Sequence, residues 1–390
     1  MQLIKSFWFN RFQVYDDGEY LIFFDILIGK KRKIVKLFFS SFQPVTIDLA
    51  YLKFGFFNSA ILFSPRELNG QDGGFLTPFD WQFPCITEKK AYENHLSHDL
   101  LDHIDKGFHI YIGFPWATLI DRKTINPELF KRLNLILSGY KNILLEYGIQ
   151  LHIHSVCQHI YWEQCIELWA GLGFTDIWLS HKEADKVYSL PFEVHPWPLF
   201  SVNVEDQDRC SGIKKNIHPR NKKYLASFIG THADHYLTES RKKLKVLEKY
   251  PDFYIKFTNQ WHFEKVVYDH QIEGSAIADC YFIDETVFEY NDILSNSKFT
   301  LCPSGSGPNT LRLWEALAVG SVPILLGRHP ALPEGAGGEE IHWDNIMICI
   351  DDDQIEHLPQ ILSSYSNNEI YQRQQNGLLA YEYIKGQKCF

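Results

Sequence analysis

A glycine-rich turn between a short strand and a helix is the feature that most constrains the fold of this chain. Residues 298–302 are apolar and strand-like, and the two glycines of the turn at 304–307 (SGSG) let backbone amides approach a ligand closely. Pro308 suits the first position of a helix, and apolar residues then recur at helical spacing until Gly320. With the apolar run at 321–326, the sequence therefore predicts the strand–turn–helix–strand unit of a parallel α/β sheet.

The start of this helix is a predicted site for a phosphate group. Free amides and the positive end of the helix dipole attract anions there. Arg312 and Glu315 lie three residues apart, on one face, where a cation could meet a diphosphate and a carboxylate could accept from ribose hydroxyls. The same pattern also fits an ordinary glycine turn with a surface ion pair. The lysine of a P-loop and the third glycine of a dinucleotide-binding turn are both absent.

At these residues the chain resembles the exostosin-type glycosyltransferases of family 47. The shared order is Leu-Cys-Pro, a glycine turn, Arg-x-x-Glu-Ala-Leu, a glycine and Val-Pro-Ile, which runs here from Leu301 to Ile324. Upstream, RNKKYLASFIG (220–230) followed by Arg241 is similar to another motif of the family, with a spacing one residue longer. The resemblance extends over about residues 220–365.

The resemblance implies an inverting glycosyltransferase that moves a sugar from a nucleoside-diphosphate sugar, in the first place a UDP-sugar, to a glycan hydroxyl. The acceptor would be a glycan or a lipid-linked glycan in the synthesis of a surface polysaccharide. Neither a metal nor another cofactor is expected, because arginines and a helix N-terminus can stabilise the departing diphosphate, while Glu315 would hold the ribose. The residues expected to bind the nucleotide sugar are Arg220, Gly230, Arg241, Ser304, Gly305, Ser306, Gly307, Arg312 and Glu315.

Length and the alternation of strands and helices predict the architecture. A chain of 390 residues exceeds what one hydrophobic core usually serves. We expect an α/β protein with two Rossmann-like, doubly wound domains that face a cleft, the arrangement called GT-B. The predicted parts are an acceptor-side domain at 1–195, a nucleotide-sugar domain at 196–365 and a C-terminal helix at 366–390 that crosses back to the first domain.

In-line attack by an acceptor hydroxyl needs a general base from the first domain. His159 is the favoured candidate because it follows a strand end and its neutral imidazole can accept a proton near neutral pH. A histidine that opens a helix is as often a surface residue, and a carboxylate in a glycine-rich loop is as often a turn residue. The full set of candidates is Asp72, Asp80, His159, Glu163 and His181.

Other patterns leave alternatives open. His152, His154 and His159 could form the metal site of a metal-dependent hydrolase. A non-catalytic sugar-binding partner of a transferase complex is a third possibility. The aspartates at 351–353 contain a D-x-D that could hold a divalent metal, but the sequence favours their role as caps of the following helix.

Charge and apolar patterning limit the partners. The 38 basic and 48 acidic residues give a net charge of −10, which argues against a nucleic-acid-binding protein. The basic stretch at 214–223 could still hold phosphate or anionic lipid heads. Eight cysteines without C-x-x-C spacing suggest reduced thiols, and the apolar run at 21–29 is too short to span a membrane. We therefore expect a cytoplasmic protein with at most peripheral contact at the inner face of the membrane.

Overall fold

The computed structural model describes residues 81–96, 107–122, 127–146, 150–259, 285–335, 340–387 and 389, together with six short strands between residues 2 and 63. The first strands are antiparallel and were not predicted. β1 (Gln2–Phe7), β2 (Phe12–Asp16) and β3 (Leu21–Ile22) form one sheet, and β4 (Phe24–Ile28) pairs with β5 (Lys31–Val35).

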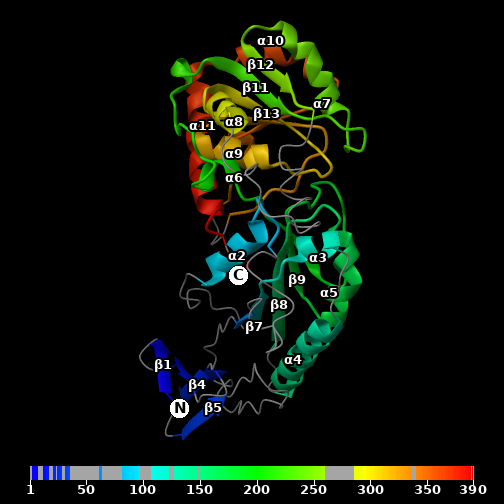
Figure 1. Ribbon diagram of the computed structural model, residues 1–390, viewed down its shortest axis with the longest axis vertical. Coiled ribbons are helices and arrows are strands. Elements are labelled where there is room, and N and C mark those ends of the chain that lie inside the picture. The colour runs from blue at the N-terminus through cyan, green and yellow to red at the C-terminus, as the bar shows by residue number, and fades with distance from the viewer. Residues whose placement is uncertain are drawn as a thin grey trace.

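Two parallel five-stranded sheets form the body of the protein, one above the other in Figure 1. The first has the order β10-β9-β8-β7-β6, and the second has the order β12-β11-β13-β14-β15. Strands of the first sheet are β6 (Ile61–Phe63), β7 (Gly107–Ile112), β8 (Gln150–Cys157), β9 (Asp176–Leu179) and β10 (Glu193–Pro196). Those of the second are β11 (Tyr224–Gly230), β12 (Phe253–Phe257), β13 (Ser297–Pro303), β14 (Val322–Leu326) and β15 (Ile348–Ile350). The predicted α/β class with two parallel sheets is confirmed.

Side-chain alternation gives the first sheet two different faces. Ile110, Ile153 and Ile177 are buried in one core with helices α3 (Trp116–Arg122), α4 (Pro127–Glu146) and α5 (Ile166–Leu172). Tyr111 is one residue after Ile110 and Val156 is three residues after Ile153, so both lie on the other face, where they join a smaller cluster with α2 (Thr87–Leu96). The same face carries polar residues at the remaining alternate positions.

The second sheet has helices on both faces. On one face α8 (Glu285–Ser295), α9 (Leu311–Val319) and α11 (Asn367–Ile384) enclose a core that includes Trp314 and Leu325. On the other face the 3₁₀ segment Leu244–Lys249 and α10 (Leu358–Ser363) cover a core that includes Phe299 and Ile324.

The strand order of the second sheet places a ligand site. The chain steps from β11 to β12 on one side and then returns to β13 on the other side of β11. In open α/β sheets, ligands bind at such a reversal, beyond the carboxyl ends of the strands. The SGSG turn follows β13 at this point, and the predicted order of strand, turn and helix is confirmed. The helix begins at Leu311, however, so Pro308 is not its first residue as predicted. Gly320 ends α9 with φ at +74°, a conformation that favours glycine.

The two sheets are joined by polar contacts at the turn. Nδ2 of Asn309 donates to the carbonyl of Ser180 at 2.7 Å, and the amide of Ala331 donates to the carbonyl of Lys182 at 2.8 Å. After α11 the chain returns to α2, where the amide of Cys389 donates to Nε2 of His95 at 3.0 Å (Figure 1). The division at 195 and 365 stays a prediction. No helix in the described part of the chain has the length and apolar character needed to cross a bilayer.

Candidate functional site

Two arginines meet at the carboxyl ends of β11 and β13. Arg241, on the short helix α7 (Ser240–Lys243), donates from Nε to the carbonyl of Ser304 at 3.1 Å and from Nη1 to the carbonyl of Thr231 at 2.9 Å. Arg312, in the first turn of α9, donates from Nη2 to the carbonyl of Ile229 at 2.5 Å. Both guanidinium groups therefore lie where the reversal of strand order predicts a ligand.

Both guanidinium groups are buried and neither has an acidic partner. Arg241 and Arg312 are each 8% exposed, and no carboxylate of the described residues lies within ion-pair distance of either. The Arg312 group lies 4.6 Å from the ring centroid of Phe228, and the Arg241 group lies 4.5 Å from that of Tyr236. Within the described residues, Nε and Nη1 of Arg312 have no hydrogen-bond partner. Burial and the adjacent Arg312 charge lower the pKa of Arg241 to about 10, so it stays charged at neutral pH.

Unpaired buried charge is costly, and a bound anion would relieve the cost. A diphosphate carries two or three charges and several acceptor oxygens, which suit two adjacent guanidinium groups. The arginine pair, Arg241 with Arg312, is therefore a candidate diphosphate site.

Glycines let the arginines lie against the backbone. A Cβ atom at Gly230 would stand 2.9 Å from Nη2 of Arg312, and one at Gly305 would stand 3.0 Å from Nη2 of Arg241. Either substitution would push a guanidinium group out of place. The structure thus brings together Gly230, Gly305 and both arginines, as the resemblance implied.

The serines of the turn differ in exposure. Ser304 is 1% exposed, and its hydroxyl lies 3.2 Å from Oγ1 of Thr238. Ser306 is half-buried, and its hydroxyl lies 3.1 Å from Nε2 of His235. Of the two hydroxyls, that of Ser306 is the one a ligand can reach.

The carboxylate of Glu315, the expected ribose ligand, is buried and hydrogen-bonded within the protein. The side chain is 1% exposed, and Oε1 accepts from the backbone amide of Asn203 at 3.1 Å and from Nδ2 of the same residue at 2.9 Å. Oε2 accepts from the hydroxyl of Tyr290 at 2.6 Å. The carboxylate therefore joins α9 to α6 (Val202–Glu205) and α8, and it is satisfied within the protein.

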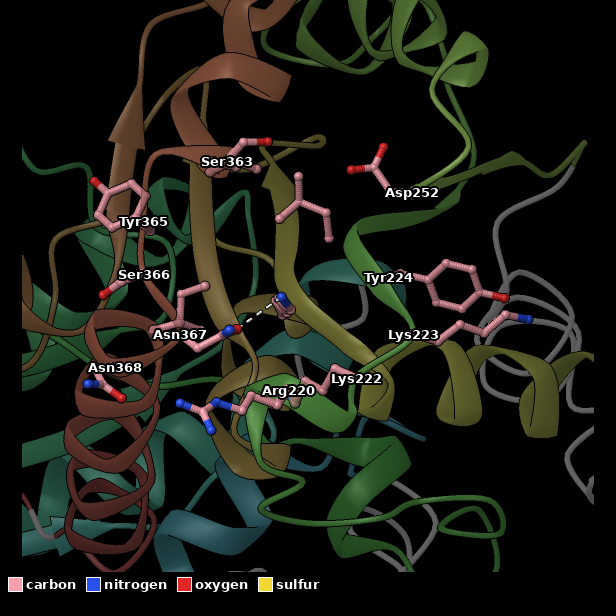
Figure 2. Close-up of a pocket in the computed structure, with 14 residues that line it drawn as sticks. Arg220, Lys222, Lys223, Tyr224, Asp252, Ser363, Tyr365, Ser366, Asn367 and Asn368 are labelled. Carbon is pink, nitrogen blue, oxygen red and sulfur yellow. Dashed lines mark hydrogen bonds between the residues drawn. The ribbon is translucent and has the colours of Figure 1, made fainter.

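Arg220 also lies apart from the site. It stands just before β11, at the amino end of that strand, whereas the arginine pair lies at the carboxyl end. Arg220 lines a pocket of about 620 Å³ with Lys223, Lys298 and Asn367 (Figure 2). This pocket and the arginine pair are at opposite ends of β11, so the pocket does not coincide with the candidate diphosphate site.

His181 lies directly across from the SGSG turn. It follows β9, and its ring is so close to Gly307 that a Cβ atom there would overlap it. Nδ1 of His181 is buried and has no hydrogen-bond partner in the part of the chain that the structure describes. Burial, and to a smaller extent the electrostatic effect of nearby His159, lowers the pKa of His181 to about 3. The imidazole is therefore neutral near pH 7 and keeps an acceptor nitrogen.

The other base candidates are less well placed. His159 has both ring nitrogens engaged, because Nε2 lies 2.9 Å from Oδ1 of Asp121 and Nδ1 accepts from the amide of Tyr161 at 3.0 Å. Glu163 is exposed and pairs with Lys186 at 2.8 Å. Asp72 and Asp80 lie outside the described residues.

A buried carboxylate near this site was not predicted. Glu88, in the first turn of α2, is 2% exposed and accepts at 3.1 Å from the backbone amides of Gln158 and of Ala117. Burial raises its pKa to about 8, although these hydrogen bonds lower it. In the sequence Glu88 looks like an ordinary acidic residue at a helix start, so no signal separates it from a surface residue.

The structure does not bring His152, His154 and His159 together as the ligands of one metal site. His152 and His154 stack on His109, whereas His159 pairs with Asp121 beyond the end of β8.

The predicted cap role of the aspartates at 351–353 is wrong, because Gln354 occupies the N-cap of the helix at 355–357 and no side chain caps it. Oδ1 of Asp352 instead accepts from the Ser240 hydroxyl at 2.6 Å and thereby fixes the helix that carries Arg241.

Sequence comparison identifies the family of this site. Residues 176–365 match the model of the Exostosin GT47 domain. The chain is 29% identical over 195 residues to Exostosin-1 of Drosophila melanogaster, an alignment that covers 48% of this chain and 24% of that protein. It is 26% identical over 213 residues to Ribitol-5-phosphate xylosyltransferase 1 of Danio rerio, covering 49% and 44%.

Residues 176–365 thus form an exostosin GT47 domain, and the chain is a distant homologue of exostosins and other GT47 glycosyltransferases. The match begins at β9, upstream of residue 220, where the resemblance in the motifs begins. The chain spans less than half the length of these two relatives.

Solved structures show a looser similarity. The pneumococcal O-GlcNAc transferase GtfA in complex with UDP and GlcNAc has a TM-score of 0.35 and 13% identity, covering 76% of this chain and 57% of that chain. S. aureus MnaA in a co-structure with UDP has a TM-score of 0.34 and 10% identity, covering 83% and 93%.

Proposed function

We propose that this protein is a glycosyltransferase that moves a sugar from a nucleoside-diphosphate sugar, in the first place a UDP-sugar, to a glycan hydroxyl. The observation that carries the proposal is the arginine pair: two buried, charged and acid-free guanidinium groups at the strand-order reversal of a GT47 domain. The printed names of the relatives, an exostosin and a xylosyltransferase, support the same reaction class.

The diphosphate would lie on Arg241 and Arg312, beside the amides of the SGSG turn. As the bond from the anomeric carbon to the diphosphate oxygen breaks, negative charge grows on that oxygen. Two guanidinium groups fixed by carbonyl contacts can stabilise this charge without rearrangement. The turn would close over the nucleotide, with the Ser306 hydroxyl available to it.

The acceptor hydroxyl would attack the anomeric carbon from the face opposite the diphosphate and lose its proton to a base. Among the described candidates His181 is best placed for this role, since its ring faces Gly307 and its Nδ1 is not engaged by any of the described residues. A single displacement inverts the configuration, so an α-linked donor would yield a β-linkage in a glycan or lipid-linked glycan of a surface polysaccharide.

Calorimetric titration with UDP tests the site. Arg312→Gln and Arg241→Gln should each weaken UDP binding by about 1.5–3 kcal/mol, the range for a lost hydrogen bond to a charged group. Arg220→Gln is the matched control, because this exposed arginine lies at the opposite end of β11 and should leave the affinity unchanged. Equal UDP affinity in all three folded variants would contradict the assignment.

A further inference from the structure

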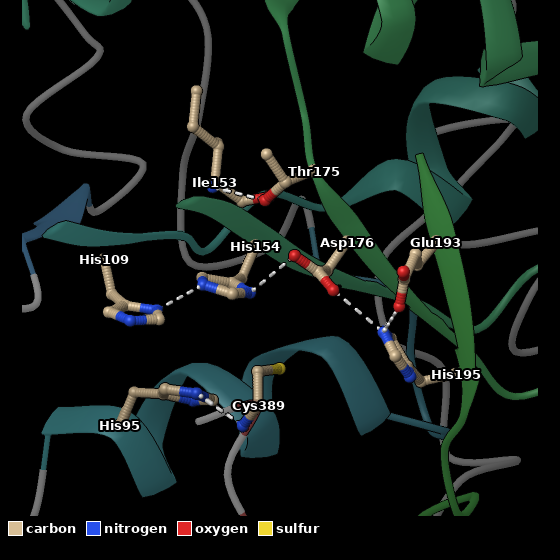
Figure 3. Close-up of polar contacts among 9 residues, drawn as sticks. All are labelled: His95, His109, Ile153, His154, Thr175, Asp176, Glu193, His195 and Cys389. Carbon is tan, nitrogen blue, oxygen red and sulfur yellow. Dashed lines mark hydrogen bonds and ion pairs between the residues drawn. The ribbon is translucent and has the colours of Figure 1, made fainter. Parts of the chain in front are cut away.

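One face of the first sheet carries a row of polar side chains that the proposed transfer does not use (Figure 3). His109, His154, Asp176 and His195 stand on four adjacent strands, β7 to β10. Nδ1 of His109 lies 2.8 Å from Nε2 of His154, and Nδ1 of His154 lies 3.6 Å from Oδ2 of Asp176. The row is on the face opposite to the apolar core of α3, α4 and α5.

Three possible ligand atoms gather at the end of this row. Oδ1 of Asp176 lies 2.9 Å from Nε2 of His195, and Oε2 of Glu193 lies 3.9 Å from the same nitrogen. Strand pairing produces the arrangement: Glu193 is the cross-strand partner of Asp176, and His195 follows two residues later on the same face. Within the described residues this is the one group of three or more such side chains whose ligand atoms all lie within 4.8 Å of one another.

We propose that Asp176, Glu193 and His195 bind a zinc ion or a similar divalent transition metal. Zinc takes imidazole nitrogen and carboxylate oxygen at about 2.0–2.2 Å, so that ligand atoms of a tetrahedral shell stand about 3.3 Å apart. The separations of 2.9 and 3.9 Å lie on either side of this value, and small side-chain rotations reach it. The imidazole favours zinc over calcium or magnesium, which prefer all-oxygen shells.

The contacts around these residues support a metal site. Asp176 is held from behind by His154, and the ring of His195 stacks on Trp178 with centroids 4.4 Å apart. Such outer contacts orient the metal ligands before the ion binds. Asp176 and His195 are 16% and 33% exposed, and Glu193 is 81% exposed, so an ion can enter and Glu193 can swing onto it.

The ion would join β9 to β10 near the amino ends of both strands. His181 follows the other end of β9, so the ion would brace the strand that carries the proposed base while staying apart from the diphosphate site. We therefore expect zinc to raise thermal stability, since it binds the folded form in preference.

Zinc titration of the metal-stripped full chain tests the site. A Cys349→Ser background removes an exposed thiol that would bind zinc by itself. In this background we expect one equivalent of zinc to bind and to raise the melting temperature. Glu193→Ala should weaken zinc binding by about tenfold or more, with the fold intact because the side chain is exposed.

His195→Ala should remove the binding, whereas His218→Ala is the matched control. His218 is a half-buried histidine that stacks on Tyr371 away from this row, and its replacement should leave zinc affinity unchanged. Absence of saturable zinc binding in the background protein would overturn the proposal. Unchanged zinc affinity in both Glu193→Ala and His195→Ala would overturn it as well.

Discussion

The imidazole of His181 packs against the backbone of Gly307, so closely that no side chain fits at position 307. The contact joins the end of β9 in the first sheet to the turn that precedes α9 in the second. It places an unprotonated ring nitrogen beside the proposed sugar donor.

Gly307→Ala should therefore impair catalysis. The added Cβ would stand 2.8 Å from Cε1 of His181 and 2.8 Å from Cγ2 of Ile160, so the ring must move. We expect kcat to fall by about tenfold or more, as expected for a misplaced base. Gly171→Ala, in α5, is the control, since its Cβ would meet nothing within 4 Å. Equal kcat for both variants would show that the contact has no catalytic role.

His181→Gln tests the base directly. Turnover should fall by about a hundredfold or more while UDP affinity stays nearly unchanged, because a base acts only in the chemical step. Kinetics with saturating donor, together with a UDP titration of the same protein, check both parts. Full turnover would exclude His181 and leave Asp72 and Asp80 as the candidates to substitute next.

Glu315→Ala should cost stability and spare nucleotide binding. The substitution leaves the Tyr290 hydroxyl and the Asn203 amide without their buried acceptor, which costs about 1–3 kcal/mol per group. Chemical denaturation measures the loss. A folded Glu315→Ala protein with normal stability and weakened UDP binding would restore the ribose role.

The raised pKa of Glu88 predicts that the stability of the protein depends on pH. This pKa is raised from 4.5 to about 8 in the folded protein, so the folded state binds a proton that the unfolded state has lost between these values. The free energy of unfolding should therefore fall as the pH rises through this range. Glu88→Gln removes this proton uptake, so the difference in stability between about pH 6 and about pH 9 should shrink. An identical pH profile for both proteins would contradict the raised pKa.

Turnover should persist in excess chelator, because the arginine pair can stabilise the leaving diphosphate without a metal. Loss of a zinc ion from the first sheet should lower the melting temperature without stopping transfer well below it. The double variant Asp351→Ala with Asp353→Ala should keep its turnover too. Activity that returns only with added manganese or magnesium would contradict this prediction.

Local pattern was enough for the strand, turn and helix around residues 298–326, because glycine and apolar spacing act over short distances. The motifs of Arg241 and Arg312 follow two neighbouring strands, and the structure places both side chains at the ends of these strands, while their binding of a diphosphate stays a prediction. Pattern was not enough for Glu315, since the sequence does not say which face of α9 meets Asn203 and Tyr290. Arg220 precedes the strand at 224–230 and so lies at its amino end, away from the carboxyl end that carries the arginine pair.

The choice of His181 as the proposed base and the row of polar side chains on the first sheet could not be predicted from the sequence, because both depend on tertiary contacts. His159 and His181 look alike in the sequence, and only the neighbours of their ring nitrogens separate them. Asp176 and His195 are brought together by the pairing of β9 with β10.

The configuration of the sugar first released from an α-linked UDP-sugar tests the central claim most directly, and it needs no knowledge of the acceptor. Water can replace the acceptor hydroxyl in slow donor hydrolysis, and proton NMR early in the reaction reports the anomer before it equilibrates. Across a panel of UDP-sugars, an inverting mechanism predicts release of the β anomer from at least one donor. This hydrolysis should be lost in Arg312→Gln and kept in Arg220→Gln. Release of the α anomer, or no release by a protein that binds UDP, would contradict the proposed mechanism.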